Sequence, residues 1–135
     1  MEKESLNTTV PMSKNKSSLN TSLFTFDIPR LVEKMKHQDI WAKEELHSMI
    51  LFKNTDKQII LIILQEGTEL KSFQSNESIT VQIIEGKLKF YTRRKTVTLK
   101  KGQLLTLNEN IKYRLTAKEE TVFLLTIVNG VLQFA

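Results

Sequence analysis

The chain has 135 residues, of which 40% are apolar, which is enough for one folded domain with a buried core. It contains no cysteine, so disulfides and thiolate metal sites are excluded and a reducing compartment is expected. No apolar run exceeds Ile59–Leu64 and the N-terminus has no apolar signal region, so we expect a cytoplasmic protein that does not span a membrane. A net charge of +5 is too small to imply a nucleic-acid partner by itself.

The N-terminal part is expected to contain a tail and a helix. Residues 1–22 are rich in Ser, Asn, Thr and Lys and lack periodic apolar positions, which predicts a disordered tail. Residues 23–47 form the predicted helical lead-in. Its first helix begins near Asp27, a favourable N-cap residue, and Ile40–Met49 could add a further helical turn or two. Leu31, Val32 and Met35 recur at helical spacing, and Trp41 and Leu46 are expected to face inward.

Residues 48–135 change to short apolar stretches separated by turn residues. This pattern, with no long helix between the stretches, predicts an antiparallel sandwich or barrel. The stretch Gln58–Leu64 is apolar on both faces, so its outward side chains need cover from the N-terminal segment or from a second subunit, and we favour a homodimer. The predicted strands are Met49–Phe52, Gln58–Leu64, Ile79–Glu85, Lys87–Arg93, Thr96–Leu99, Leu104–Leu107, Lys112–Thr116 and Thr121–Val128.

Three glycines in this region have an informative spacing. Gly67 and Gly86 frame the stretch GTELKSFQSNESITVQIIEG, and Gly102 follows the turn Lys100–Lys101. With the strand pattern, this framing resembles the cupin superfamily, whose motifs G-x5-H-x-H-x3-E-x6-G and G-x5-P-x-G-x2-H-x3-N fit from Gly67 and from Gly102. The resemblance covers roughly residues 48–128. It implies an all-β, cupin-type double-stranded β-helix, a jelly-roll barrel, behind the short helical segment and the disordered tail.

On this alignment the four metal-ligand positions of the cupin motifs fall on Phe73, Ser75, Ile79 and Tyr113. These side chains are poor ligands for a divalent metal, so the resemblance implies a metal-free cupin without a cofactor. The four side chains are expected to converge inside the barrel. They either fill it or line an apolar pocket in which the hydroxyls of Ser75 and Tyr113 orient a small molecule, and they are our predicted ligand-binding residues.

The two histidines do not repair this loss. His37 and His47 are ten residues apart and lie outside both motifs, so we expect exposed or partly packed side chains rather than ligands. Glu77 and Glu85 are expected to be surface turn residues.

The sequence leaves the function open between a binding or regulatory protein and an enzyme. We favour a protein that is not an enzyme: a cupin that binds a small molecule, or a structural or regulatory module, with no catalytic residue assigned. The enzyme alternative is a metal-independent, isomerase-like cupin. It needs a base inside the barrel, and Tyr113 is the one titratable group that the motifs place there, with an ordinary pKa near 10.

A third hypothesis is polyanion binding by the hairpin Lys87–Lys101, which contains seven basic residues and no acidic one. Arg93, Arg94 and Lys95 at its turn are the candidate contacts. Tyr91 is the only aromatic residue on the basic face, so nucleic acid is not an expected partner and a solvated outer face is the favoured interpretation.

Overall fold

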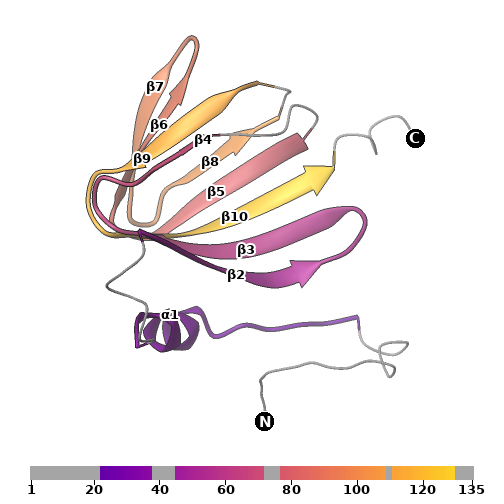
Figure 1. Ribbon diagram of the computed structural model, residues 1–135. Helices are drawn as coiled ribbons and strands as arrows, with labels where there is room; N and C mark the ends of the chain where they lie inside the picture. Colours follow the sequence, from indigo (N-terminus) through magenta and orange to yellow (C-terminus); the bar gives the residue numbers. More distant parts are fainter. Residues whose placement is uncertain (1–21, 38–44, 72–76, 109–110, 130–135) are drawn as a thin grey trace.

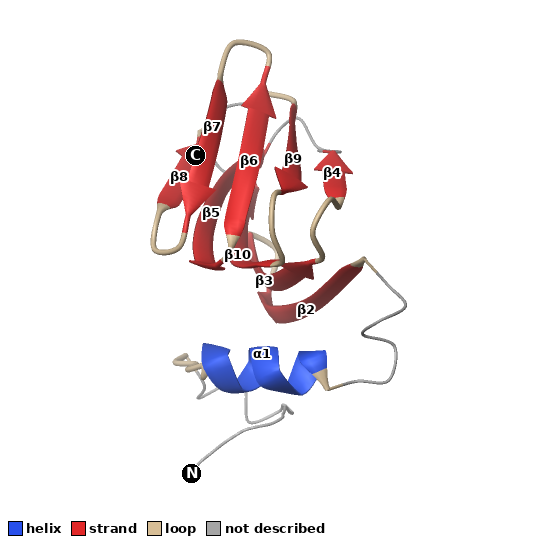
Figure 2. Cartoon of the chain, turned by 90° about the vertical axis from the view of Figure 1, so that its left-hand side faces the viewer, coloured by secondary structure: helices blue, strands red, loops and turns tan. Residues whose placement is uncertain are grey.

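The computed structural model describes residues 22–37, 45–71, 77–108 and 111–129 (Figure 1). These residues form two β-sheets packed face to face, with one helix, α1 (Ile28–Lys36), against the outer face of the larger sheet (Figures 1 and 2). The all-β sandwich predicted from the strand spacing is therefore confirmed. The predicted tail lies outside the described residues, apart from Ser22. In the part of the chain that the structure describes, no helix is long and apolar enough to cross a bilayer.

The two sheets contain only antiparallel neighbours. Figure 1 shows that they lie close together at one end and diverge at the other. The five-stranded sheet has the order β2 (Leu46–Lys53), β3 (Lys57–Leu64), β10 (Thr121–Asn129), β5 (Glu77–Glu85) and β8 (Leu104–Leu107). The four-stranded sheet has the order β4 (Glu69–Lys71), β9 (Tyr113–Ala117), β6 (Lys87–Thr92) and β7 (Thr96–Lys100).

Strand β5 shows how the sequence pattern builds the core. Ile79, Val81 and Ile83 alternate along the strand and are buried between the two sheets. Because successive side chains of a strand point to opposite faces, Gln82 is left on the outer face, where it is exposed. The alternation predicted for this strand is confirmed.

The outer face of the five-stranded sheet has a core of its own under α1. Leu61 and Ile63 of β3 point to this side and pack with Val32 and Met35 of the helix. The helix begins where expected, because the Asp27 side chain accepts a hydrogen bond from the backbone N–H of Arg30 at 3.3 Å. Of the two covers predicted for β3, the N-terminal segment is thus confirmed, and the homodimer stays a prediction.

One predicted element is wrong. The helical extension expected for Ile40–Met49 does not include its last residues, because Leu46 already begins β2. Leu46 does face inward, and it packs against the core between the sheets as part of a strand. Pairing with the buried strand β3 outweighs the helix propensity of the preceding polar residues. Residues 38–44, with Trp41, lie outside the described residues.

Candidate functional site

A cavity of about 160 Å³ lies between the two sheets, at the end where they diverge. It is placed where β5 and β9 begin and where β4, β8 and β10 end. Most of its wall is apolar, and the polar side chains among the described residues that line it are Lys71, Glu77 and Tyr113. The apolar wall includes Ile79, Leu107, Leu115, Phe123, Leu125 and Ile127.

Strand pairing explains why the wall on the five-stranded sheet is apolar. Ile79 of β5 lies opposite Ile127 of β10 on one side and opposite Leu107 of β8 on the other. Directly paired residues share a face of the sheet, so these three branched side chains form a row across three strands. Phe123 and Leu125 continue the same face of β10 toward the core.

Tyr113 enters the cavity from the opposite sheet. Its ring stacks on the buried ring of Phe90, with centroids 5.0 Å apart and planes 16° apart. An offset stack of this kind fixes the ring while it leaves the hydroxyl at the ring's far end. Tyr113 therefore presents a positioned polar group to a mainly apolar space.

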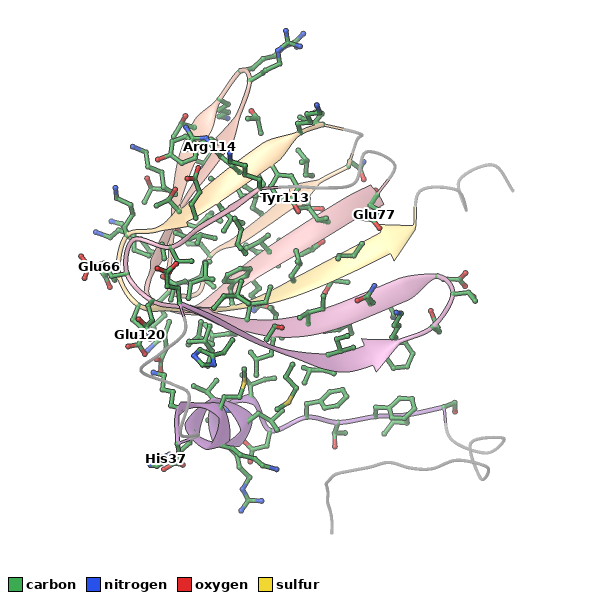
Figure 3. The ribbon with its side chains drawn as sticks, in the orientation of Figure 1. His37, Glu66, Glu77, Tyr113, Arg114 and Glu120 are labelled. Carbon is green, nitrogen blue, oxygen red and sulfur yellow. The ribbon has the colours of Figure 1, made fainter. Side chains whose placement is uncertain are left out.

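The charge of Glu77 acts on the Tyr113 hydroxyl. Burial raises the pKa of the Tyr113 hydroxyl, and the negative charge of Glu77 raises it further. Burial also raises the pKa of the Glu77 carboxyl. Figure 3 shows the two residues on opposite sheets at the wide end of the sandwich. A ligand group placed here meets a hydrogen-bond acceptor at Glu77, and a second negative charge would be repelled.

The structure brings together two of the four predicted ligand-binding residues. Ile79 and Tyr113 both line the cavity and come from opposite sheets. Phe73 and Ser75 lie outside the described residues. Ligand binding by these four residues stays a prediction.

Sequence reasoning missed Glu77. It was expected in a surface turn, yet it is the first residue of β5 and lines the cavity. The available signal was its position two residues before Ile79, which places both side chains on the same face of a strand. Tyr113 is therefore not the only titratable group at the cavity, because Glu77 and Lys71 are there as well.

The described lining does not fit a divalent metal. Its one carboxylate and one phenol fall short of the several oxygen or imidazole ligands that such a site needs. His37 caps α1, with its Nδ1 atom 2.7 Å from the carbonyl oxygen of Glu33, and is exposed. His47 is more buried than expected, opposite Ile63 on the helix side of β2, away from the cavity. No three His, Cys, Asp or Glu side chains gather anywhere within residues 22–37, 45–71, 77–108 and 111–129.

Comparison with known proteins found solved structures with a similar architecture. No protein-family model and no curated protein matches the sequence. Among solved structures, the chain is similar to a conserved protein of unknown function from Streptococcus pyogenes, with 25% identity, a TM-score of 0.59 and coverage of 62% of this chain and 74% of that one. It is also similar to a cupin superfamily protein from Desulfitobacterium hafniense, with 15% identity, a TM-score of 0.60 and coverage of 62% and 77%.

A third similar structure is the cupin domain of an XRE family transcriptional regulator from Enterobacter cloacae. The identity is 17%, the TM-score is 0.56, and the match covers 63% of this chain and 97% of that domain. The similar structures thus include proteins of unknown function and a domain of a regulator. They identify an architecture that hosts many functions, so the function has to be argued from the site.

Proposed function

We propose that this cupin β-sandwich binds a small, mainly apolar molecule in the cavity between its sheets, without a metal. The observation that supports this proposal is an open, apolar cavity with a few polar groups at one place, which is the usual composition of a small-molecule site. Its volume of about 160 Å³ limits the ligand. An apolar cavity of about 150 Å³ holds a benzene molecule, so we expect one ring or a branched chain of similar size.

The polar groups of the cavity favour a ligand with a hydrogen-bond donor. The Glu77 carboxylate only accepts hydrogen bonds when it is ionised, and the Tyr113 hydroxyl both donates and accepts. An amine or a hydroxyl group supplies the donor that the Glu77 carboxylate accepts. A carboxylate would lie close to the charge of Glu77, which already raises the pKa of Tyr113. Lys71, the one cation of the described lining, is exposed to solvent and offsets this repulsion only in part, so the expected ligand is neutral or positively charged at its polar end.

Methyl-resolved NMR of the full chain tests this proposal with defined probes. Benzyl alcohol, benzylamine and benzoate share one apolar body and differ in the polar group. We expect benzyl alcohol and benzylamine to shift the methyl signals of Ile79 and Ile127, and benzoate to bind more weakly. Leu61 and Ile63, which face α1, should not respond. The proposal is wrong if none of the probes shifts the cavity methyls, or if the α1-side methyls shift as much.

Two neighbouring leucines provide matched variants. Leu125 lines the cavity, whereas Leu124, the preceding residue, packs on the α1 side of the same strand, and both are half-buried. Leu125→Phe should reduce the cavity volume and abolish the methyl shifts caused by benzyl alcohol. Leu124→Phe adds the same volume to the other face and should leave these shifts intact. Equal responses in the two variants would place the binding site elsewhere.

The enzyme alternative keeps a specific candidate residue. A metal-independent isomerase needs a general base, and Glu77 supplies a carboxylate at the cavity, whereas Tyr113 with its raised pKa is a poor base. This alternative predicts that the protein catalyses exchange of the α-protons of cyclohexanone for deuterium in heavy water, and that Glu77→Gln abolishes the exchange. Binding without exchange is the outcome that our proposal expects.

A further inference from the structure

The positive charge of the chain is concentrated in one part of the fold. Residues 86–118 contain ten of the chain's 20 Lys and Arg residues but only one of its 15 Asp and Glu residues. The remainder of the chain is therefore net acidic, although the whole chain carries +5. This span supplies β6, β7, β8 and β9 with the turns between them. Such separation creates a surface potential that the modest net charge conceals.

Strand alternation places much of this charge on the outer face of the four-stranded sheet. Leu88 and Phe90 of β6 are buried between the sheets, so Lys87, Lys89 and Tyr91 project outward. Figure 2 shows β6 between β7 and β9. The β6–β7 turn then adds a group of exposed cations at the end of the hairpin, which consists of Arg93, Arg94 and Lys95.

Strand β9 adds a guanidinium group that packs against the aromatic ring on the outer face of the β6–β7 hairpin. Arg114 lies directly opposite Tyr91 in the β6–β9 register, and its guanidinium carbon is 3.9 Å from the centre of the Tyr91 ring. The ammonium group of Lys89 is 5.5 Å from the same centre. Arg114 also donates a hydrogen bond to Glu69 at 3.0 Å, which keeps the exposed guanidinium in place. Tyr91 and Arg114 thus form a close aromatic and guanidinium pair with Lys89 beside it.

The acidic groups that the structure describes beside this face are paired. Glu69 is bound to Arg114, and Glu119 lies 3.9 Å from the Lys87 ammonium at the edge of the sheet. Among the described residues of β6, β7 and β9 there is no acidic side chain. The face therefore keeps an excess of positive charge along a strand of six residues, or roughly 20 Å.

We propose that this outer face, with Lys89, Tyr91 and Arg114 at its centre and the β6–β7 turn at its end, binds single-stranded nucleic acid. The cations contact successive phosphates, and the Tyr91–Arg114 pair stacks on an unpaired base. The proposal is independent of the cavity, which lies on the other face of the same sheet. An anionic membrane fits less well, because the turn carries Arg93 and Arg94 and no apolar side chain that would enter a bilayer.

Fluorescence anisotropy of the full chain with a labelled oligothymidylate of about 15 nucleotides tests the charge contribution. Replacing Arg93, Arg94 and Lys95 together with Gln removes three cations from the turn. Three lost phosphate contacts should weaken binding roughly 100-fold at about 0.1 M salt and reduce the slope of log affinity against log salt by about two. The matched control replaces three exposed cations elsewhere, Arg30, Lys34 and Lys53, and should bind as the wild type does. Equal losses in both triple variants would overturn the proposal, because only net charge would then matter.

Substitutions at Tyr91 separate nucleic acid from other polyanions. Tyr91→Phe keeps the ring and should bind the oligonucleotide normally, whereas Tyr91→Leu should bind it roughly tenfold more weakly. Inorganic polyphosphate should bind both variants alike. If Tyr91→Leu binds the oligonucleotide as tightly as Tyr91→Phe does, the face is a general anion surface and the proposal is wrong. It is also wrong if phosphatidylserine vesicles bind and the oligonucleotide does not. Unchanged thermal melting of each variant shows that the fold is intact.

Discussion

Gly86→Ala should be among the most damaging small substitutions in this fold, because two separate effects add at one turn. Gly86 connects β5 to β6 and thereby links the two sheets. Its φ of +96° lies in the region that residues with a Cβ atom rarely adopt. A Cβ atom here would also press against the carbonyl oxygen of Glu120 and lie 2.7 Å from the Cα atom of Thr121. Both atoms belong to the backbone, so a side-chain rotation cannot relieve the contact.

The expected loss of stability follows from these contacts. Forcing a residue with a Cβ atom into a positive φ costs about 1–3 kcal/mol. Moving the backbone around Thr121 also disturbs its fully buried hydroxyl, which accepts a hydrogen bond from the backbone N–H of Lys87 at 3.2 Å and donates one to a carbonyl oxygen, that of Glu119 at 2.8 Å or that of Lys87 at 3.0 Å. Each lost hydrogen bond costs about 1 kcal/mol. We therefore expect Gly86→Ala to lower the free energy of unfolding by about 3–5 kcal/mol, much of the stability of a typical small domain.

Gly102→Ala is the matched control. Gly102 has a similar φ of +84°, but a Cβ atom there would meet nothing within 4 Å. It should cost only the backbone strain, about 1–3 kcal/mol, without the loss of the Thr121 hydrogen bonds. Urea unfolding followed by circular dichroism measures both variants and the wild type. If the two substitutions destabilise the protein equally, the close approach of Gly86 to the β9–β10 turn does not add to the cost of Gly86→Ala, and the reasoning is refuted.

Further predictions concern the helix and the cavity. Met35→Ala should lower the free energy of unfolding by about 2–4 kcal/mol, because Met35 is only 3% exposed under the sheet. Lys36→Ala should cost less than about 1 kcal/mol, because its ion pair with Glu120 is partly exposed, and urea unfolding measures both variants. Glu77→Gln should lower the pKa of Tyr113, since it removes a negative charge, although burial still holds this pKa above 10.0; NMR titration of the tyrosine ring carbons measures it. Because burial raises the pKa of Glu77 above its ordinary 4.5 in the folded state, the contribution of Glu77 to stability should fall as the pH rises from 4.5 through the folded pKa. The free energy of unfolding of the wild type relative to that of Glu77→Gln, measured across this range, should therefore decline.

The strands were predictable because burial follows the two-residue period directly. Stretches such as Ile79–Glu85 alternate between the core and the outer face, and the structure follows that alternation. Strand β4 was not predicted, since it has only three residues and two of them are exposed and charged. Its extended conformation depends on pairing with β9, which is more than forty residues away in the sequence. The end of the helical lead-in was mistaken for the same reason, because pairing with β3 determines the conformation of Leu46.

The candidate site was predictable only in part. Motif spacing identified Ile79 and Tyr113 as neighbours although they are on different sheets. The same sequence could not predict whether the space between them is filled, because the cavity volume depends on how far the two sheets diverge. That separation is set by many packed side chains together rather than by the residues of any one strand. Glu77 was missed because it was interpreted as a turn residue instead of an extension of the strand period.

The register between β6 and β9 connects the two proposed sites. Tyr113 and Arg114 are consecutive residues, so one points into the cavity and the other to the outer face. A slip of one residue would exchange them and move the Arg114 guanidinium into the apolar space between the sheets. Arg114 would leave solvent and its partner Glu69 for a mainly apolar space in which Glu77 is the one carboxylate of the described lining, and burying the ion there would cost several kcal/mol. Arg114 therefore holds Tyr113 in the cavity, and the charge that makes the outer face basic also fixes the geometry of the inner one.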